Sequence, residues 1–549
     1  NPQQIADLKA LKGDSSDNIP NVPGVGTKTA SKLLQEFGHI DNVLVSIDEV
    51  TPPKLRQLLI DHQDTLRMAL GLTTIVTSVP ISLDVGTSIW GRYDRQEVLE
   101  LFRELEFTSL FERLPDLKEA SANLQDQMVF PEQSKPAATP TDYRLVANEK
   151  DLATFTNELA TSKAFAFDME TTSKKPIEAR LVGASFATKP GRAWYVAIAH
   201  LDTSPDFSEK AINHLKPILE DPTKAKIAHN GSYDLSVLAN HGVQVQGLVF
   251  DTMLAAHMLN EKSIGLKALA FNQLEVEMKP IDSLIGKGAQ QITMDRVPQE
   301  DAYSYACADA DMTLRLKELF EPLLKAQGTW DLFNQVEMAL VPALVAIERS
   351  GVTINIPALN NMSQWLGQKL AELEAEIFDL TGHSFNLNSP QQLSEVLFTE
   401  LKLPKSKRTK TGYSTNAQAI EDLKRKLREE TGHEPEILEH LLDYRELSKL
   451  RSTYVDALPR LVNPTSQRVH TSFNQAGSTT GRISSSEPNL QNIPVRTDLG
   501  RQVRESFIAP NQNWLLLSGD YSQIELRILV HISQDAGLLD AFNQGEDIH

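Results

Sequence analysis

The chain has 549 residues, with 54 Lys and Arg against 73 Asp and Glu and a formal net charge of −19. Its 41% hydrophobic and 23% charged residues are ordinary for a globular protein and exclude a disordered, collagen-like or membrane-embedded chain. The single cysteine, Cys307, excludes an intrachain disulfide and a zinc site built on several thiolates, and it fits a reducing, cytoplasmic compartment.

Charge and chain ends narrow the class of protein further. The acidic balance argues against a protein that coats DNA more than against a metal-dependent nuclease, which needs clustered carboxylates. No apolar run approaches the roughly 20 residues that span a bilayer, and the first residues lack the pattern of a signal peptide. The chain starts without Met and stops at His549 without a capping glycine or a polar tail, so we expect a fragment.

The first half of the sequence predicts a helical segment followed by an α/β segment. Residues 1–114 are predicted to be mostly helical, with one Gly/Pro-rich turn at Pro20–Gly26. Residues 116–142 have the composition of a linker. In residues 143–325, apolar runs of strand length, the first at Ala164–Asp168, alternate with helical patterns, which is typical of an α/β domain.

The second half returns to helices and ends in another α/β segment. Residues 331–462 hold long amphipathic patterns, interrupted by a basic run without acids at Lys402–Lys410. This run is either a contact to DNA phosphates or a solvated loop. A new segment begins near Val469, in which Trp514–Asp520 is predicted to be a buried strand that ends in a carboxylate and Ser522–Ile532 the helix after it.

The turn near the front of the chain carries residues suited to a phosphate. Gly24 and Gly26 allow a tight turn between helices, and Thr27 could cap the second helix. Exposed N–H groups at that helix start would hold a phosphate, although a plain helix–helix turn is the alternative. Two carboxylates, Asp14 and Asp17, lie just upstream.

Acidic residues of the 143–325 segment predict a metal site. Asp168 and Glu170 stand two apart at a predicted strand end, so both side chains share one face and favour a hard divalent ion between them. Asp234 falls in the first turn of a helix, and Tyr305 and Asp309 share a helical face. Four acids could hold two metals about 3.5–4 Å apart, with Tyr305 orienting the attacking water.

A structural role is the alternative for each acid taken alone: a solvated strand end or a helix cap. As an ordered set, however, Asp-x-Glu, Asn-x-x-x-Asp and Tyr-x-x-x-Asp resemble the 3′→5′ exonuclease domain of the DEDD superfamily, tyrosine subtype, which has an RNase H-like fold. The resemblance implies two Mg²⁺ or Mn²⁺ ions per active site, held by Asp168, Glu170, Asp234 and Asp309, and Tyr305 as the residue that positions water. Asp311, six positions after Tyr305, faces away.

The front of the chain resembles the helix-hairpin-helix region of the 5′-nuclease domain in the bacterial DNA polymerase I family. The resemblance implies that Asp14 and Asp17 bind one metal and that Gly24, Gly26 and Lys28 grip the duplex backbone. The other metal ligands of that family would precede Asn1, so we expect this segment to bind DNA without cutting it.

The C-terminal segment resembles family A DNA polymerases in two motifs. Thr479–Arg496, by composition a polar loop, closely matches the loop that contacts primer–template, which implies DNA contacts by Arg482, Asn489, Gln491, Asn492 and Arg496. Asp520–Arg527 looks like motif A, which implies that Asp520 binds the Mg²⁺ of the incoming nucleotide and that Glu525 excludes a ribose 2′-OH. The other nucleotide-binding residues so implied are Tyr521, Gln523 and His549.

The resemblance covers the whole chain and implies an α/β and α multidomain fold. Its parts are a helical 5′-nuclease remnant at 1–115, a linker at 116–142, the exonuclease domain at 143–328, and a helical thumb with the start of a family A palm at 329–549. The basic run then becomes the thumb tip, and Lys449–Tyr454 the thumb-to-palm junction. The fingers and the second palm carboxylate would follow His549, so we expect exonuclease activity and no polymerisation from this chain.

The implied function is DNA-directed DNA synthesis with 3′→5′ proofreading, in bacterial DNA replication and repair. The implied partners are primer–template, single-stranded 3′ ends and deoxynucleoside triphosphates, with no membrane, for a monomer in the nucleoid-containing cytoplasm. Two alternatives stay open: a stand-alone 3′→5′ exonuclease of the RNase D type, and a non-catalytic DNA-binding scaffold whose carboxylates are structural.

Overall fold

The computed structural model describes residues 2–14, 16–82, 94–105, 107, 110, 114, 141–409 and 412–546. Most of the expected linker, Lys410 and His549 therefore lie outside the described residues. The chain divides into two compact units, residues 1–128 and 129–549, and each is described by itself.

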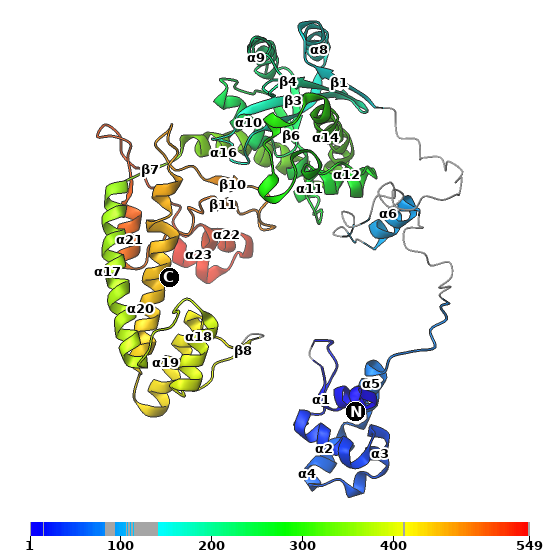
Figure 1. Cartoon of the computed structure of the whole chain (residues 1–549), viewed down its shortest axis with the longest axis vertical. Helices are drawn as coiled ribbons and strands as arrows, with labels where there is room; N and C mark the ends of the chain where they lie inside the picture. Colours follow the sequence, from blue (N-terminus) through cyan, green and yellow to red (C-terminus); the bar gives the residue numbers. More distant parts are fainter. Residues whose placement is uncertain are drawn as a thin grey trace. The chain divides into compact units, whose positions relative to one another are not determined.

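The first unit is helical, as the sequence predicts (Figure 1). A core of buried aliphatic side chains, including Leu11, Val25, Leu34 and Leu66, holds the helices between residues 5 and 73 together. The helices are α1 (Ile5–Lys12), α2 (Thr27–Phe37), α3 (Ile40–Val45), α4 (Pro53–Asp61), α5 (Gln63–Thr73) and α6 (Arg95–Glu104), with single turns η1 (Pro2–Gln4) and η2 (Ile47–Glu49).

The Gly/Pro-rich turn lies between α1 and α2. Gly24 has φ +80°, a conformation that favours glycine, and the turn therefore depends on it. The expectation that Thr27 caps α2 is wrong: the N-cap is Gly26, with no side-chain cap bond, and Thr27 is the first helical residue. Because the extended residue Gly26 is the N-cap, Thr27 already lies inside the helix. The side chain that accepts the first free N–H groups of a helix belongs to the N-cap residue, one position earlier.

The front of the second unit is the predicted α/β segment, built on one six-stranded sheet in the order β1-β4-β3-β2-β5-β6. Strands β2 and β3 and strands β3 and β4 pair antiparallel, whereas β1–β4, β2–β5 and β5–β6 pair parallel. The strands are β1 (Asp142–Val146), β2 (Ala164–Thr171), β3 (Leu181–Lys189), β4 (Arg192–Ala197), β5 (Ala225–Ala228) and β6 (Leu248–Asp251).

Helices cover both faces of this sheet (Figure 1). Helix α8 lies on one side, and the long helix α14 packs along the other side against β1 to β5. The helices of this part are α8 (Glu149–Thr161), α9 (Pro205–Leu219), α10 (Gly231–Asn240), α11 (Thr252–Met258), α12 (Leu266–Leu274), α13 (Asp282–Ile285) and α14 (Gln299–Gln327), with turns η5 (Gly288–Gln290) and η6 (Met294–Arg296).

The two faces of the sheet carry different side chains because residues alternate along each strand. The α8 face is aromatic. The centre of the Phe155 ring of α8 lies 5.2 Å from the centre of the Phe186 ring and 5.7 Å from that of Trp194. The α14 face is lined mainly by small residues, and α14 meets it with buried alanines, which brings helix and sheet close together. The small residues of the sheet face are Ala166, Gly183, Ser185, Ala187, Ala193 and Ala197, and those of α14 are Ala302, Ala306 and Ala310.

The remainder of the second unit is mainly helical, with two buried clusters, one around Leu393 and Leu438 and one around Leu359 and Val455. Its α-helices are α15 (Trp330–Leu332), α16 (Met338–Ser350), α17 (Ile356–Thr381), α18 (Pro390–Glu395), α19 (Ala417–Thr431), α20 (Glu436–Leu450), α21 (Asp498–Glu505), α22 (Ile524–Ser533) and α23 (Ala536–Asn543). The π-helical turns η7 (Phe333–Glu337), η8 (Val396–Glu400) and η9 (Arg451–Val455) and the 3₁₀ turn η10 (Leu458–Leu461) adjoin them. Short strand pairs are β7 (Thr353–Ile354) with β12 (Phe507–Ile508), β8 (Arg408–Thr409) with β9 (Gly412–Tyr413), and β10 (Ser472–Asn474) with β11 (Ser484–Ser486).

One predicted element is wrong. Trp514–Asp520 forms no strand, and its apolar side chains are exposed, with Leu515 at 92% and Leu517 at 97% exposure. A buried strand needs neighbouring strands for its N–H and C=O groups and a layer over each face. Within the part of the chain that the structure describes, no strand pairs with this segment. The helix predicted after it is present as α22.

The helical stretch Trp330–Ser350 is long and apolar enough to cross a membrane, judged by length and composition alone. Its apolar side chains include Phe333, Met338 and Val341, which are buried in the core of the α/β segment. Core burial therefore accounts for part of its hydropathy, since 28% of its 18-residue apolar window is buried and Leu332, Val336 and Ile347 are exposed.

Substitution of Gly183 by Ala should destabilise the second unit. A Cβ at Gly183 would overlap the phenol ring of Tyr195, which is fully buried on the same face of the sheet. We expect a loss of about 1–3 kcal/mol in unfolding free energy, measured by chemical denaturation. Gly265→Ala is the matched control, because Gly265 has φ −73° and a methyl group there would have no other atom within 4 Å. Equal stability of the two variants would contradict the expected overlap.

Candidate functional site

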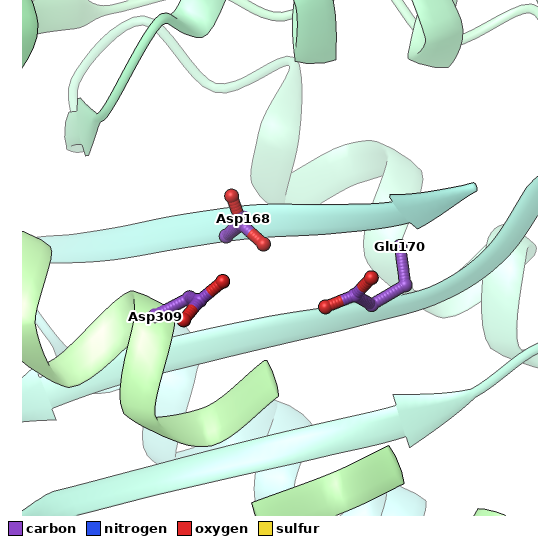
Figure 2. A group of neighbouring side chains, drawn as sticks. All are labelled: Asp168, Glu170 and Asp309. Carbon is purple, nitrogen blue, oxygen red and sulfur yellow. The ribbon is translucent and has the colours of Figure 1, made fainter. Parts of the chain in front are cut away.

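Three carboxylates from distant parts of the sequence meet between the sheet and α14 (Figure 2). Asp168 and Glu170 project from β2, and Asp309 projects from α14 toward them. One oxygen from each lies within 4.8 Å of the others. Asp168 is half-buried, whereas Glu170 and Asp309 are 6% and 8% exposed. The period of two along β2 places both acids on the α14 face, as the sequence predicts.

Burial and mutual repulsion favour the neutral form of each acid. Burial, together with the charge of Asp309, raises the pKa of Asp168 well above its usual value. Burial and the charge of Asp168 do the same to the pKa of Glu170. Burial raises the pKa of Asp309 to about 7. A nearby positive charge would therefore stabilise the ionised form of these three carboxylates near neutral pH.

The donor atoms of this cluster fit a hard divalent cation. Among the described residues, Glu170 Oε1 and Asp309 Oδ1 are buried and accept no hydrogen bond. A buried carboxylate oxygen without a partner is unfavourable unless a cation or water satisfies it. All the converging ligands are carboxylate oxygens, which suit magnesium or manganese better than softer metals.

Asp234 lies beside this group without being one of its three mutually close members. It is buried in the first turn of α10, and its carboxylate accepts a hydrogen bond from the backbone N–H of Met169, between the two acids of β2. Burial and the charge of Asp168 raise its pKa well above the usual value. The structure thus brings the fourth predicted acid to the same strand, next to the closest cluster.

Asp251, which the sequence analysis missed, fixes the start of α10. Its buried carboxylate accepts the N–H groups of Asn230 and Gly231 at 3.2 and 2.7 Å, and those of Met253 and Leu254 at 2.9 and 3.2 Å. One side chain therefore caps both α10 and α11 and holds Asp234 in place. An Asp followed by Thr at the end of an apolar run is a helix-start signal that could have revealed the α11 cap.

Tyr305 and Asp309 share one face of α14, as predicted, and the Tyr305 hydroxyl is hydrogen-bonded to the Asp309 carboxylate. Burial raises the pKa of Tyr305 well above its usual range. Lys267, a second residue that the sequence analysis missed, donates from Nζ to Tyr305 Oη at 3.2 Å. No spacing rule links a lysine on α12 to a tyrosine on α14, so only the fold could reveal this contact.

Asp311 has a separate structural role, in agreement with the prediction that it faces away. Its oxygens accept hydrogen bonds from the Tyr143 hydroxyl and the Gly191 N–H at 2.8 Å each. The guanidinium of Arg315 pairs with it at 2.8 Å.

In the first unit, a lysine lies where a metal was expected. Lys9 Nζ is 2.8 Å from Asp14 and 3.6 Å from Asp17, so its ammonium group bridges the two carboxylates. A hydrogen bond from Lys9 lowers the pKa of Asp14. In the turn, Gly24, Gly26 and Lys28 are all exposed, which leaves this backbone open to a ligand.

The residues expected to contact DNA are largely exposed and form local contacts. Gln491 donates to the carbonyl of Ile483, and the Asn489 side chain accepts the Gln491 N–H, which fixes the loop. The carbonyl of Asn492 accepts from the Tyr454 hydroxyl at 2.6 Å, and that of Arg496 accepts from Arg501 at 3.4 Å.

The two C-terminal motifs are neighbours in space. Arg482, from the polar loop, pairs with Glu525, in the first turn of α22, at 2.7 Å. Asp520 and Tyr521 are exposed in the irregular segment before α22, and Gln523, with φ 52°, is its N-cap. Asp520 therefore does not stand at a strand end, contrary to the prediction.

Comparison with protein families divides the chain into three matched regions. Residues 1–96 match the family described as 5′-3′ exonuclease, C-terminal SAM fold. Residues 143–325 match the family described as 3′-5′ exonuclease, and residues 356–549 match DNA polymerase family A. The acidic cluster lies within the second region.

Curated relatives match along the entire chain. The DNA polymerase I of Chloroflexus aurantiacus is 41% identical, that of Pseudomonas aeruginosa 39% and that of Bacillus subtilis 36%, each over 100% of this chain. The chain spans 60%, 60% and 58% of those relatives, respectively. A solved structure, "POL domain of Pol1 from M. smegmatis complex with DNA primer-template and dNTP", is 31% identical with a TM-score of 0.61, covering 74% of this chain and 65% of that one.

The acidic cluster should make the metal-free protein less stable as the pH rises. The folded chain holds a proton on Asp309 up to about pH 7, whereas an unfolded chain releases it near its ordinary pKa of 3.8. Stability is therefore lost between those pH values, by a few kcal/mol at most. We expect Asp309→Asn to flatten this fall in the melting temperature, measured in EDTA from pH 5 to pH 8.

Added Mn²⁺ should raise the melting temperature of the unmodified chain at pH 8 and have little effect on Asp309→Asn. Asp301→Asn is the control, because Asp301 is exposed on the same helix. A fall with pH that is equally steep in Asp309→Asn and the unmodified chain would contradict the assignment.

Proposed function

Because the chain belongs to the DNA polymerase I family along its whole length, we propose that residues 143–328 are a metal-dependent 3′→5′ exonuclease acting on single-stranded or frayed DNA 3′ ends. One observation carries the proposal: Asp168, Glu170 and Asp309 converge within 4.8 Å beside Tyr305, and two of their buried oxygens have no partner among the described residues. Carboxylates that were only structural would have hydrogen-bond donors at those oxygens.

The metal in this proposal is Mg²⁺ or Mn²⁺, two per site, held by Asp168, Glu170, Asp309 and Asp234. When bound, such ions lower the pKa of a water molecule and stabilise the departing 3′ oxygen. Asp234 reaches the site from α10, whose start is fixed by Asp251, so its carboxylate is held in place before any ion arrives.

Tyr305 positions the attacking water in this proposal. Its own proton is directed to Asp309, so the phenol oxygen can interact with water only as an acceptor. A water that donates one proton to Tyr305 keeps its lone pairs free to face a phosphorus atom. Because Glu170 and Asp309 are only 6% and 8% exposed, the site suits a frayed 3′ terminus better than a paired one.

The proposal for the C-terminal region is template-directed DNA synthesis by the whole protein. Arg482, Asn489, Gln491, Asn492 and Arg496 would contact primer–template, in keeping with the DNA complex of the M. smegmatis relative. Asp520 would bind the metal of a deoxynucleoside triphosphate, with Tyr521, Gln523, Glu525 and His549 around the nucleotide. The pairing of Arg482 with Glu525 supports a shared site for the two motifs.

In the first unit, residues 1–115, we assign the turn at Gly24, Gly26 and Lys28 to the backbone of duplex DNA. Asp14 and Asp17 would bind a metal only after release of Lys9, which now bridges them. In this proposal residues 116–142 would be the linker, and residues 329–549 the thumb and part of the palm. The protein acts as a monomer in the bacterial cytoplasm, in DNA replication and repair.

The alternatives are less well supported. A stand-alone exonuclease of the RNase D type has no use for residues 356–549, which match DNA polymerase family A. In a non-catalytic scaffold nothing would offset the cost of burying Glu170 Oε1 and Asp309 Oδ1, which have no hydrogen-bond partner among the described residues.

The exonuclease proposal is tested with a 5′-labelled single-stranded oligodeoxynucleotide and Mg²⁺. We expect the unmodified chain to shorten it from the 3′ end, and EDTA to stop the reaction. Asp309→Asn and Asp234→Asn should each lower the rate by roughly 10²–10³-fold, because each removes a carboxylate that would hold a metal ion at the reacting phosphate.

Asp301→Asn removes an exposed charge from the same helix and should keep the full rate. The site assignment would be refuted by an unchanged rate in Asp234→Asn, and the proposed function by an unmodified chain that releases no mononucleotides.

A further inference from the structure

Lys267 is a cation placed against the acidic cluster by a helix that contributes nothing else to it. Helix α12 begins after Gly265 and is anchored by the buried side chains of Leu269, Ala270 and Phe271, and it packs against α14. Lys267, in its first turn, is half-buried and faces Tyr305. The packing of α12 therefore fixes the backbone from which Lys267 extends, and the hydrogen bond to Tyr305 holds its ammonium group.

Lys267 contacts Tyr305 in two ways. Its Nζ donates to the phenol oxygen at 3.2 Å, and the ammonium group lies 4.7 Å from the centre of the phenol ring. A cation over an aromatic ring and a donor to its oxygen each restrict the ring's rotation, and together they leave it one orientation. The charge of Lys267 also lowers the pKa of Asp168, Glu170 and Asp309.

The hydrogen bonds of Tyr305 then have a fixed direction. The phenol donates its proton to Asp309 and accepts one N–H from Lys267, which leaves a single lone pair on the oxygen. A water molecule could approach that oxygen from only one side. Without Lys267 the second lone pair would be open, and water could bind on either side of the oxygen.

We propose that Lys267 is a positioning residue of the exonuclease site, which holds the Tyr305 hydroxyl so that it accepts the attacking water in one orientation. Lys267 acts through Tyr305 and is not a metal ligand, because an ammonium group has no lone pair to offer. The inference rests on the proposed exonuclease function and adds to it a residue outside the three acidic motifs.

A double-mutant cycle tests the proposal. The variants are Lys267→Met, Tyr305→Phe and the pair, with release of mononucleotides from a single-stranded oligodeoxynucleotide as the first readout. We expect Lys267→Met to lower kcat by about tenfold or more with little change in KM, as for an interaction used in the transition state. In the Tyr305→Phe background the same change should have less than about a twofold effect, since its target is gone.

Two further measurements separate positioning from a general structural role. Binding of Mn²⁺, followed by the loss of the free-ion paramagnetic signal, should be no weaker in Lys267→Met than in the unmodified chain. The melting temperature of Lys267→Met should also be unchanged. If the methionine lowers the melting temperature, the double-mutant cycle is repeated with Lys267→Gln. Lys150→Met, at an exposed position on α8, controls for the loss of one positive charge on DNA binding.

The outcomes are distinct. Equal effects of Lys267→Met in the two backgrounds, with an active unmodified chain, would overturn the inference and leave the exonuclease proposal standing. Loss of Mn²⁺ binding in Lys267→Met would also overturn it. An unmodified chain that binds Mn²⁺ and degrades no DNA would contradict the proposed function itself, and the inference with it.

Discussion

The repulsion among three clustered carboxylates, two of them buried and one half-buried, is the constraint on which the α/β segment depends. Asp168, Glu170 and Asp309 bring oxygens within 4.8 Å of one another in a space that is largely closed to solvent. Like charges at that distance destabilise a fold unless protons or cations neutralise them. The surrounding elements must therefore supply enough packing energy to keep the acids together, and the large buried core shared by the sheet, α8 and α14 does so.

The division of labour between the two sheet faces explains how this is possible. Large aromatic side chains stand on the α8 face, where the rings of Phe155, Phe186 and Trp194 pack against one another. The α14 face carries small side chains beside the acids. On β3, Gly183 pairs with Glu170 of β2, and Ser185 pairs with Asp168. The aromatic packing and the acidic site thus lie on opposite faces of β2. The residues of this strand that pack against α8 are therefore different from those that form the site.

The sequence predicted those parts of the site whose geometry is local. The period of two in Asp168-Met169-Glu170 and the four-residue spacing of Tyr305 and Asp309 each fix a shared face, and both predictions are confirmed as geometry. The contacts of Lys267 and Asp251 depend on how α12, α10 and α11 pack, so no local spacing contains them. The failure at Trp514–Asp520 has the same origin, because an apolar run indicates a tendency to be buried but not the presence of neighbours.

Among the described residues, Glu170 Oε1 has no hydrogen-bond partner, because the hydroxyl of a nearby tyrosine donates to another acceptor. Tyr195 lies on the same face of the sheet, where burial and then the charge of Glu170 raise the pKa of its phenol, yet its hydroxyl hydrogen-bonds with His200 Nε2 at 2.7 Å. The other ring nitrogen of His200 donates to the carbonyl of Val297 at 2.7 Å, and burial lowers the pKa of this histidine, so Nε2 is a bare acceptor. The phenol must then be the donor in the Tyr195–His200 bond. With its proton directed away, Tyr195 cannot satisfy Glu170, and the carboxylate keeps a lone pair directed into the site, where only a cation or water can use it.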